Sequence, residues 1–480
     1  MFQSFRWCRA FISVVHRLST IAAAGHCYAR PSVRSIRTDT RSATNISSTP
    51  SSSDPQNEMD KFKLASRYKY GEYSIWIEIS KLTAITKPLN LGQGFPDYEP
   101  PSRFPQFLAE VASENNLNFH QYTRGLGHVR LVNAISKLYS NLINREIDAL
   151  NEVLVTVGAY EALYCAIQSN IEVGDEAIVI EPYFDCYEPM IRIAGGTPRF
   201  IPLRNTKPNA EVSHSSDWKL DPEELASLFN AKTKLIIINT PHNPLGKVFD
   251  YEELNMIADL AKKHNVLVIS DEVYEWLVYE PAKHTRIASL PDMWERTITI
   301  GSAGKSFSMT GWKLGWAYGP SYLIKNLCVV HQTAIYTCAT PVQEAVARAF
   351  EHEISVLNTP ESYFQNLSKE LKPKMLYLSN VLQESGFVPI IPDGGYFLVS
   401  KWTKFENKID LSAETDKYKD FRFTKWLSKN VKLQSIPYSI FYSEESKVLA
   451  EDFMRLCFFK KDETLKEAEK ILSTWTSKLL

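Results

Sequence analysis

The sequence predicts a doubly wound α/β protein, and two features of the chain indicate that class. From about Asn151 onward, short apolar runs rich in Val and Ile alternate with polar segments of helical character. Apolar runs bounded by turns are typical of strands buried on both faces, and their alternation with helices predicts a mainly parallel sheet. Beyond about residue 340, long helical stretches and short β-like pieces replace this pattern, which predicts a smaller α+β domain.

The expected elements follow the chain in order. In the larger part, strands are expected at 153–157, 177–180, 235–239, 266–270 and 297–300, and helices from 158 to about 169 and over 251–264. In the smaller part, helices are expected at 342–357, 363–385 and 464–479, with β-like pieces near 395–400 and 455–459. The resulting domain prediction is a leader and linker at 1–60, an arm at 61–104, a large domain at 105–340 and a small domain at 341–480.

The leader differs in composition from the rest of the chain. It carries seven arginines before residue 42 and no acidic residue before Asp39, and Ser47–Asn57 is a Ser- and Pro-rich linker. A helix there would place Trp7 and Phe11 on one face and arginines opposite, which is typical of a mitochondrial transit peptide. A basic leader without any address, and a cytoplasmic protein, is the alternative.

Composition limits the classes of function. With 54 basic and 55 acidic residues the formal net charge is −1, so no overall field attracts nucleic acid. The seven cysteines form no C-x-x-C pair, no apolar run has the length of a membrane span, and no metal motif occurs. We expect a soluble protein with free thiols, no metal, and no nucleic-acid or membrane partner.

Polar groups follow five of the predicted strands at their carboxyl ends. In doubly wound sheets these ends line one ligand crevice. The loops contain Gly158-Ala159-Tyr160, Phe184, Asn243, Asp271 with Tyr274, and Ser302 with Lys305. Burial at the end of a strand would lower the pKa of Lys305 towards the nucleophilic amine that a Schiff base requires.

The groups in these loops suit pyridoxal 5'-phosphate. Asp271 would hold a ring nitrogen protonated, and Asn243 and Tyr274 would bond a ring oxygen. Phe184 would stack on the ring. Backbone N–H groups after Gly158, with Ser302 and Lys313, would bind the phosphate. Taken singly, each position also fits a structural role, such as a helix cap, a turn, a core aromatic or a surface charge.

The chain resembles the fold-type I, class I aminotransferases, and within them the kynurenine aminotransferase and glutamine transaminase K group. The segments that carry this resemblance are 90–97 (NLGQGFPD), 121–123 (QYT), 239–247 (NTPHNPLGK), 270–274 (SDEVY), 301–307 (GSAGKSF) and 455–458 (RLCF). The resemblance extends from about Phe62 to the C-terminus. It implies a pyridoxal 5'-phosphate enzyme in which Lys305, Asp271 and Tyr274 are catalytic.

The resemblance also assigns the substrate pocket and a dimer. Arg455 matches the arginine that grips the substrate carboxylate, a task to which a guanidinium is suited. Trp76, Gly94, Tyr160 and Phe184 match pocket positions, and Asn243 contacts both cofactor and substrate. Tyr122 matches a residue that reaches the cofactor phosphate of a neighbouring subunit, which implies a homodimer with shared sites. Tyr336 and Thr337 stand where many relatives carry a Phe-His pair from the partner, and Gly394–Tyr396 is expected to pack.

The implied function is transfer of the α-amino group of an amino acid to a 2-oxo acid. Aromatic pocket residues favour large, flat or thioether side chains, and the resemblance makes kynurenine the leading donor, with kynurenic acid as product. Three alternatives remain. They are a glutamine or phenylalanine transaminase, a cysteine-S-conjugate β-lyase on the same site, and a non-enzymatic binding module on this fold.

Overall fold

The computed structural model describes residues 62–71, 74–208 and 212–479. The predicted transit helix and linker lie outside the described residues. The chain from Leu64 onward forms a single compact unit. The predicted domain boundaries within it stay predictions, and the sheets are described below by their strands.

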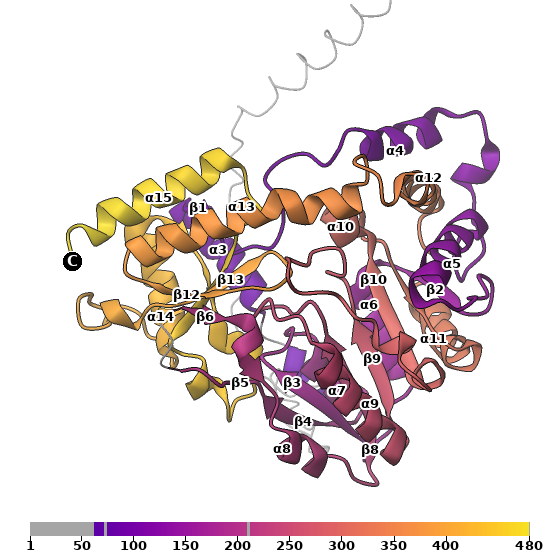
Figure 1. Cartoon of the computed structure of the whole chain (residues 1–480), viewed down its shortest axis with the longest axis horizontal. Helices are drawn as coiled ribbons and strands as arrows, with labels where there is room; N and C mark the ends of the chain where they lie inside the picture. Colours follow the sequence, from indigo (N-terminus) through magenta and orange to yellow (C-terminus); the bar gives the residue numbers. More distant parts are fainter. Residues whose placement is uncertain (1–61, 72–73, 209–211, 480) are drawn as a thin grey trace, which may run out of the picture. The chain divides into compact units, whose positions relative to one another are not determined.

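A seven-stranded sheet forms the centre of the larger part (Figure 1). In spatial order its strands are β2 (Val153–Thr156), β11 (Gly315–Tyr318), β10 (Thr297–Ser302), β9 (Leu267–Asp271), β8 (Thr233–Asn239), β3 (Glu176–Glu181) and β4 (Thr197–Pro202). Strands β10, β9, β8, β3 and β4 pair in parallel, whereas β11 is antiparallel to both β10 and β2. The predicted mainly parallel sheet is confirmed.

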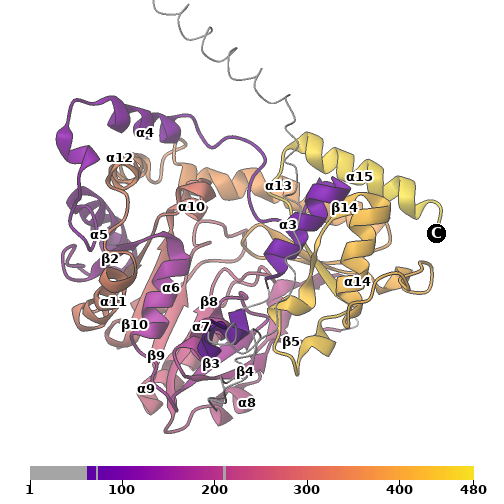
Figure 2. The ribbon, with the colours of Figure 1, turned by 180° about the vertical axis from the view of Figure 1, so that it is seen from behind.

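Helices cover both faces of this sheet because its central strands are apolar on both sides. In β8, Leu235 and Ile237 pack with α6 (Gly158–Gln168), α7 (Tyr187–Ile193) and α11 (Ser321–Ala334), and Figure 2 shows α6 in front of β9 and β10. The alternate residues Ile236 and Ile238 face α8 (Pro222–Ser227) and α9 (Tyr251–His264). This three-layer arrangement is the doubly wound class expected from continuous apolar runs.

Seven further α-helices of the described residues come from the segments before β2 and after α11. They are α3 (Ile75–Thr86), α4 (Arg103–Ser113), α5 (Val129–Ile143), α12 (Thr340–Val356), α13 (Tyr363–Glu384), α14 (Lys419–Trp426) and α15 (Asp462–Thr476). Helices α5, α12, α13 and α15 contribute to one continuous apolar cluster. The long helices expected after residue 340 are therefore present, within two residues of the predicted starts.

Local sequence explains the ends of α9, whose predicted range is confirmed. Asp250 accepts a hydrogen bond from the backbone N–H of Glu253, and the Glu253 carboxylate accepts one from the N–H of Asp250. This reciprocal capping satisfies two otherwise unpaired donors at the helix start. At the other end, Asn265 adopts a left-handed conformation that terminates the helix.

A second, five-stranded sheet joins segments that are far apart in the chain. Its order is β15 (Ile436–Pro437), β16 (Phe453–Cys457), β13 (Phe397–Lys401), β12 (Val388–Ile391) and β6 (Ser213–His214). Strand β6 comes from the segment predicted as large domain and pairs in parallel with β12. Two short pairs complete the sheets, namely β1 (Leu89–Asn90) with β14 (Leu433–Gln434) and β5 (Arg204–Asn205) with β7 (Trp218–Lys219).

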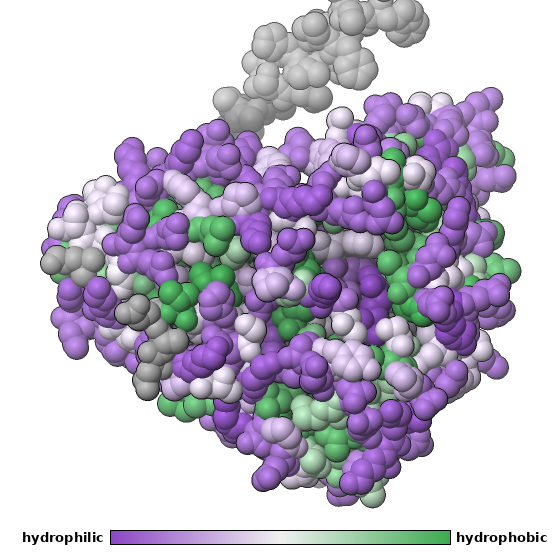
Figure 3. Space-filling view, in the orientation of Figure 1, coloured by the Kyte–Doolittle hydropathy of each residue, from purple (hydrophilic) through white to green (hydrophobic). Residues whose placement is uncertain are grey.

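Hydrophilic residues predominate on the face in Figure 3, with hydrophobic residues in smaller groups between them. Among the helices of residues 62–71, 74–208 and 212–479, none is long and apolar enough to cross a bilayer.

Candidate active site

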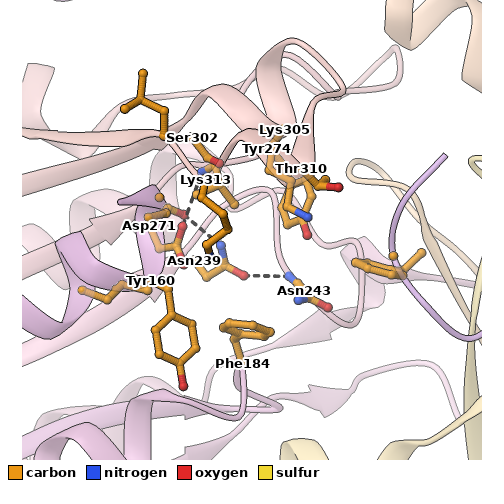
Figure 4. Close-up of a pocket in the computed structure, with 18 of the residues that line it drawn as sticks. Tyr160, Phe184, Asn239, Asn243, Asp271, Tyr274, Ser302, Lys305, Thr310 and Lys313 are labelled. Carbon is orange, nitrogen blue, oxygen red and sulfur yellow. Dashed lines mark hydrogen bonds between the residues drawn. The ribbon is translucent and has the colours of Figure 1, made fainter. Parts of the chain in front are cut away.

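Three parallel strands end at one edge of the large sheet and bring their polar residues together. In the strand register, Asp271 of β9 stands beside Asn239 of β8 and Ile300 of β10. The Asn239 side-chain amide donates to the Asp271 backbone carbonyl at 2.8 Å, and the Asn243 backbone N–H donates to Asn239 Oδ1 at 2.7 Å (Figure 4). The loop after β8 is thereby fixed against the end of β9.

A cavity of about 310 Å³ opens at this edge. Its lining residues are Trp76, Gly94, Gly158, Ala159, Tyr160, Leu163, Phe184, Asn239, Asn243, Asp271, Val273, Tyr274, Ser302, Gly304, Lys305, Thr310, Lys313, Leu314, Phe397 and Arg455. They come from the large sheet, the small sheet and the chain before α4. A small, largely apolar cavity with a few convergent polar groups is typical of a ligand site.

Lys305 lines the cavity from the short helix α10 (Ala303–Ser306), which follows β10. Its Nζ donates a hydrogen bond to the Tyr396 hydroxyl at 2.7 Å. Burial lowers the pKa of Lys305 to about 8, and the nearby Arg455 and Lys313 charges act in the same direction. Roughly a tenth of an amine with this pKa is neutral at pH 7, and this is the form that a nucleophile or base requires.

Asp271 is a buried carboxylate, 4% exposed, with one strong hydrogen bond. The Tyr187 hydroxyl donates to its Oδ2 at 2.6 Å. Burial raises the pKa of Asp271 to about 6, since the hydrogen bonds from Tyr187 and Val273 offset only part of the desolvation. A cation bound in the cavity beside this carboxylate would lower its pKa again and form a charge-assisted hydrogen bond.

One end of the cavity is suited to an anion. The N-terminus of α6 begins at Gly158, whose positive φ of 75° favours glycine. A Cβ at this position would lie 3.4 Å from Lys313 Nζ, so the helix start and the ammonium group lie close to each other. Backbone N–H groups at a helix start together with a lysine and the Ser302 hydroxyl make a site for a phosphate group.

Arg455 lies at another side of the cavity on β16, and is only 1% exposed. Its Nη1 donates to Asn243 Oδ1 at 2.9 Å and its Nη2 to the Gly92 carbonyl at 3.2 Å. The guanidinium carbon lies 3.9 Å from the ring centre of Phe397 and 5.6 Å from that of Trp76. A planar cation held between aromatic rings presents its remaining donors to a carboxylate in the cavity.

The residues present fit pyridoxal 5'-phosphate in the chemistry of their donor and acceptor groups. The anion site at Gly158 and Lys313, the carboxylate of Asp271 and the amine of Lys305 surround one cavity. These three groups complement a phosphate, a basic ring nitrogen and an aldehyde carbon respectively. Asn243 and Tyr274 line the same cavity with hydrogen-bonding groups for a ring oxygen.

Most of the residues predicted for the site lie together in this cavity, although their individual roles stay predictions. The predicted residues that line it are Trp76, Gly94, Gly158, Ala159, Tyr160, Phe184, Asn243, Asp271, Tyr274, Ser302, Lys305, Lys313 and Arg455. Tyr160 and Phe184 meet edge to face, with ring centres 6.5 Å apart.

Three predicted residues do not line the cavity of this chain. Tyr122 and Tyr336 contact each other at the surface with ring centres 5.6 Å apart, and they are 81% and 60% exposed. Thr337 follows Tyr336 and is also absent from the cavity lining. All three were predicted to act on the cofactor or pocket across a dimer interface, and that prediction stays untested in a single chain.

Sequence reasoning missed several residues that contact the site. Asn239 positions Asn243, Tyr187 holds Asp271, and Phe397 packs on Arg455. Tyr396, expected only to pack, contacts the Lys305 amine. Asn239 was detectable as the last residue of a predicted strand, whereas no local signal distinguishes Tyr187 or Tyr396 from other core tyrosines.

The fold and this lysine-centred site together define a class I aminotransferase. The chain belongs to the aminotransferase class I and II family, whose model matches residues 86–472. The protein is therefore an enzyme, and membership of this family implies dependence on pyridoxal 5'-phosphate and the use of amino acid and oxo acid substrates.

Curated relatives include two groups of kynurenine–oxoglutarate transaminases. The chain is 52% identical over 416 residues to human kynurenine–oxoglutarate transaminase 3, covering 87% of this chain and 91% of the relative. It is 45% identical to mouse kynurenine–oxoglutarate transaminase 1, covering 87% of this chain and 99% of the relative.

Solved structures share the same fold. Bna3p from Saccharomyces cerevisiae is 32% identical, with a TM-score of 0.80, over 86% of this chain and 99% of that protein. YbdL from Escherichia coli, described as having a methionine aminotransferase function, is 31% identical with a TM-score of 0.74, over 86% and 99% of the two chains.

Proposed function

We propose that this protein is a kynurenine aminotransferase, which moves the α-amino group of kynurenine to a 2-oxo acid such as 2-oxoglutarate. The observation that carries the proposal is the 52% identity to human kynurenine–oxoglutarate transaminase 3 over 87% of the chain. The cavity supports it, because Trp76, Tyr160, Phe184 and Phe397 line a site with space for a flat aromatic side chain.

We further propose that pyridoxal 5'-phosphate is held by the groups described above. Lys305 would carry it covalently, Asp271 would pair with its ring nitrogen, and Asn243 and Tyr274 would bond its ring oxygen. The N-terminus of α6, Ser302 and Lys313 would hold its phosphate. When bound, this cofactor withdraws electrons from the bond to the substrate α-hydrogen and stores the amino group between the two halves of the reaction.

The chain's own residues position the substrate and move its proton. Arg455 would grip the α-carboxylate, which fixes the direction of the α-carbon relative to Lys305. Lys305 Nζ, with its pKa lowered to about 8, would take the proton from the α-carbon as a general base. The aromatic walls would exclude water and contact the side chain, so donor preference would follow the shape of the cavity.

Ring closure removes the product of the proposed reaction from the transamination equilibrium. Removal of the α-amino group leaves a 2-oxo acid with an aromatic amine on the same molecule. The amine condenses with the newly formed 2-oxo group and releases water, which closes a second ring and gives kynurenic acid.

A spectral screen of amino donors tests the proposal. The purified holoenzyme is mixed with one amino acid at a time, and the absorbance of the lysine-bound cofactor is followed in a single turnover. Kynurenine is expected to bleach this absorbance and, with 2-oxoglutarate added, to yield kynurenic acid detected by chromatography. Bleaching by glutamine or phenylalanine but not by kynurenine would overturn the assignment of the donor.

A thioether amino acid is the second candidate donor. YbdL, 31% identical to this chain, is described as having a methionine aminotransferase function. The same screen includes methionine, and faster bleaching by methionine than by kynurenine would favour this donor. Pyruvate formed from a cysteine conjugate without an oxo acid would identify β-lyase activity instead of transamination.

We also propose a homodimer with shared sites. Its support is the exposed pair Tyr122 and Tyr336, which leaves two aromatic rings in water at the surface of one chain. Light scattering is expected to give twice the chain mass. Mixing inactive Lys305→Ala and Tyr122→Ala variants is expected to restore activity. In a mixed dimer one of the two sites would have both Lys305 and Tyr122 unchanged. Failure to restore activity would argue against shared sites.

For the leader we propose import into mitochondria. Its support is the sequence itself, with seven arginines before residue 42 and no acidic residue before Asp39. Residues 1–60 fused to a fluorescent protein are expected to direct it to mitochondria. A diffuse cytoplasmic signal would refute the assignment.

A further inference from the structure

The Tyr396 hydroxyl lies between the Lys305 amine and the backbone of the chain before α4. Lys305 Nζ donates to the hydroxyl oxygen at 2.7 Å, and the hydroxyl donates to the Gly94 carbonyl oxygen at 2.8 Å. Tyr396 is 1% exposed, so neither hydrogen bond competes with bulk water. In such a site a hydrogen bond is stronger than it would be at the surface.

This hydroxyl joins three separate parts of the fold. Lys305 follows β10 of the large sheet, Tyr396 directly precedes β13 of the small sheet, and Gly94 lies in the segment between β1 and α4. The Gly94 segment approaches so closely that a Cβ there would lie 2.4 Å from Phe397 Cζ and 3.2 Å from Tyr396 Cε2. The contact between Tyr396 and Gly94 therefore depends on glycine at position 94.

The surroundings fix the orientation of the Tyr396 ring. It packs edge to face on Tyr274 with ring centres 5.1 Å apart, and against Phe459 at 5.5 Å. Its backbone carbonyl accepts a hydrogen bond from the Phe458 N–H at 3.1 Å. A ring held on both sides and by its backbone can present its hydroxyl in only one direction.

The direction of the two hydrogen bonds matters for the lysine. A carbonyl oxygen can only accept, so Tyr396 donates its one phenol proton to Gly94, and the lone pairs of its oxygen are left for the Lys305 amine and the neighbouring Tyr274 hydroxyl. The amine must then point an N–H at Tyr396. A tyrosine that only needed a partner for a buried hydroxyl would be satisfied by Gly94 alone, so the contact with Lys305 is additional.

We propose that Tyr396 is a positioning residue for Lys305. When the Lys305 amine is not bonded to the cofactor, the Tyr396 hydroxyl orients it for proton transfer and links its position to the Gly94 segment. This inference rests on the proposed aminotransferase function, in which Lys305 Nζ is the base. The Tyr396 hydroxyl bonds both the Lys305 amine and the Gly94 carbonyl. The position of the amine therefore depends on the position of the Gly94 segment, which also lines the substrate cavity.

The test compares Tyr396→Phe with Tyr279→Phe in the holoenzyme. Tyr279 is a matched control, because it is also a buried tyrosine whose hydroxyl donates to a backbone carbonyl, that of Gly395 at 2.6 Å. Its hydroxyl has no contact with Lys305 among the hydrogen bonds of the described residues. Each substitution removes one hydroxyl and keeps the ring.

The first readout is the steady-state reaction of kynurenine and 2-oxoglutarate, with deuterium or hydrogen at the α-carbon of kynurenine. Tyr396→Phe is expected to lower kcat by about 10- to 100-fold, the effect of losing one well-placed hydrogen bond to an amine that becomes charged as it takes the proton, with KM changed by less than about threefold. Its isotope effect on kcat is expected to exceed that of the wild type, since proton removal becomes slower relative to other steps. Tyr279→Phe is expected to match the wild type in both values.

The second readout needs no amino donor. Pyridoxal 5'-phosphate is added to the cofactor-free protein, and absorbance follows the formation of the C=N bond to Lys305, with release of water. Attachment is expected to be slower in Tyr396→Phe than in Tyr279→Phe, with the same final amount bound. If the wild type converted no amino acid, the proposed function would fail, while these attachment rates would still decide the role of Tyr396.

Two results would overturn the inference. One is an isotope effect and an attachment rate in Tyr396→Phe equal to those of Tyr279→Phe. The other is a loss of activity fully explained by a smaller amount of bound cofactor, which would make Tyr396 a purely structural residue.

Discussion

Replacing Asp271 by asparagine is expected to stabilise the cofactor-free protein and to inactivate the holoenzyme. The change keeps the shape of the side chain and an oxygen that can accept from the Tyr187 hydroxyl, now 2.6 Å from Asp271 Oδ2. It removes the negative charge and replaces the oxygen that the Val273 N–H approaches at 3.4 Å by an amide NH2 group. The two opposite effects separate the electrostatic role of Asp271 from its packing.

The size of the stability effect follows from the pKa of Asp271. Burial raises this pKa to about 6, against an ordinary value of 3.8. Because the folded pKa is above the unfolded one, protonation stabilises the fold below about pH 4, and this contribution is lost as the pH rises through 6. A difference of about two between the pKa values corresponds to about 3 kcal/mol at pH 7. Asparagine is neutral throughout and avoids this loss.

Urea unfolding of the cofactor-free proteins at pH 4 and pH 7 measures the first effect. The free energy of unfolding of Asp271→Asn minus that of the wild type is expected to be higher at pH 7 than at pH 4 by about 2 kcal/mol, because the unfolded Asp271 carboxyl is already partly ionised at pH 4. In the holoenzyme, turnover of the same variant is expected to fall by about 100- to 1,000-fold or more, the scale of other losses of active-site electrostatics.

Asp420 provides a matched control away from the cavity. It is fully buried, accepts hydrogen bonds from Ser439, and burial raises its pKa to about 7. Asp420→Asn is expected to show a similar pH dependence of stability without loss of turnover. Near-normal turnover in Asp271→Asn, or a stability difference from the wild type that is equal at the two pH values, would refute the reasoning.

Two further substitutions test other parts of the site. Arg455→Lys is expected to lower kcat/KM in steady-state kinetics by about 10- to 100-fold, because lysine cannot replace a bidentate guanidinium. The control is Arg199→Lys, which changes an arginine in a surface ion pair. A change under threefold in Arg455→Lys would contradict its role in binding the carboxylate. Gly301→Ala is expected to lower the free energy of unfolding by about 1–3 kcal/mol, since its Cβ would lie 2.3 Å from Trp316. Urea unfolding measures this, and Gly311→Ala is the control because no atom lies within 4 Å of the added Cβ. Equal changes in the free energy of unfolding for the two variants would exclude the packing explanation.

The larger part of the fold could be predicted from the sequence because its information is local. Apolar runs such as Leu235–Asn239 are buried on both faces whatever strand they pair with, and the helix Tyr251–His264 carries its own caps. Strand β11 was missed because Gly315–Tyr318 (GWAY) has none of the Val and Ile residues that mark predicted strands of similar length. Strand β6 was missed because two residues give no periodic signal, and it joins the small sheet from the middle of the chain.

The sequence by itself determined the chemistry of the site: a lysine, a carboxylate and an anion site at the ends of buried strands. These could be recognised because parallel strands bring their carboxyl ends to one edge, so position along a strand predicts position in space. The tertiary structure alone decided how Arg455 meets Asn243, 212 residues away, and how Tyr396 meets Lys305, 91 residues away. Such contacts depend on the packing of two sheets and the segment before α4, and no local pattern encodes that packing.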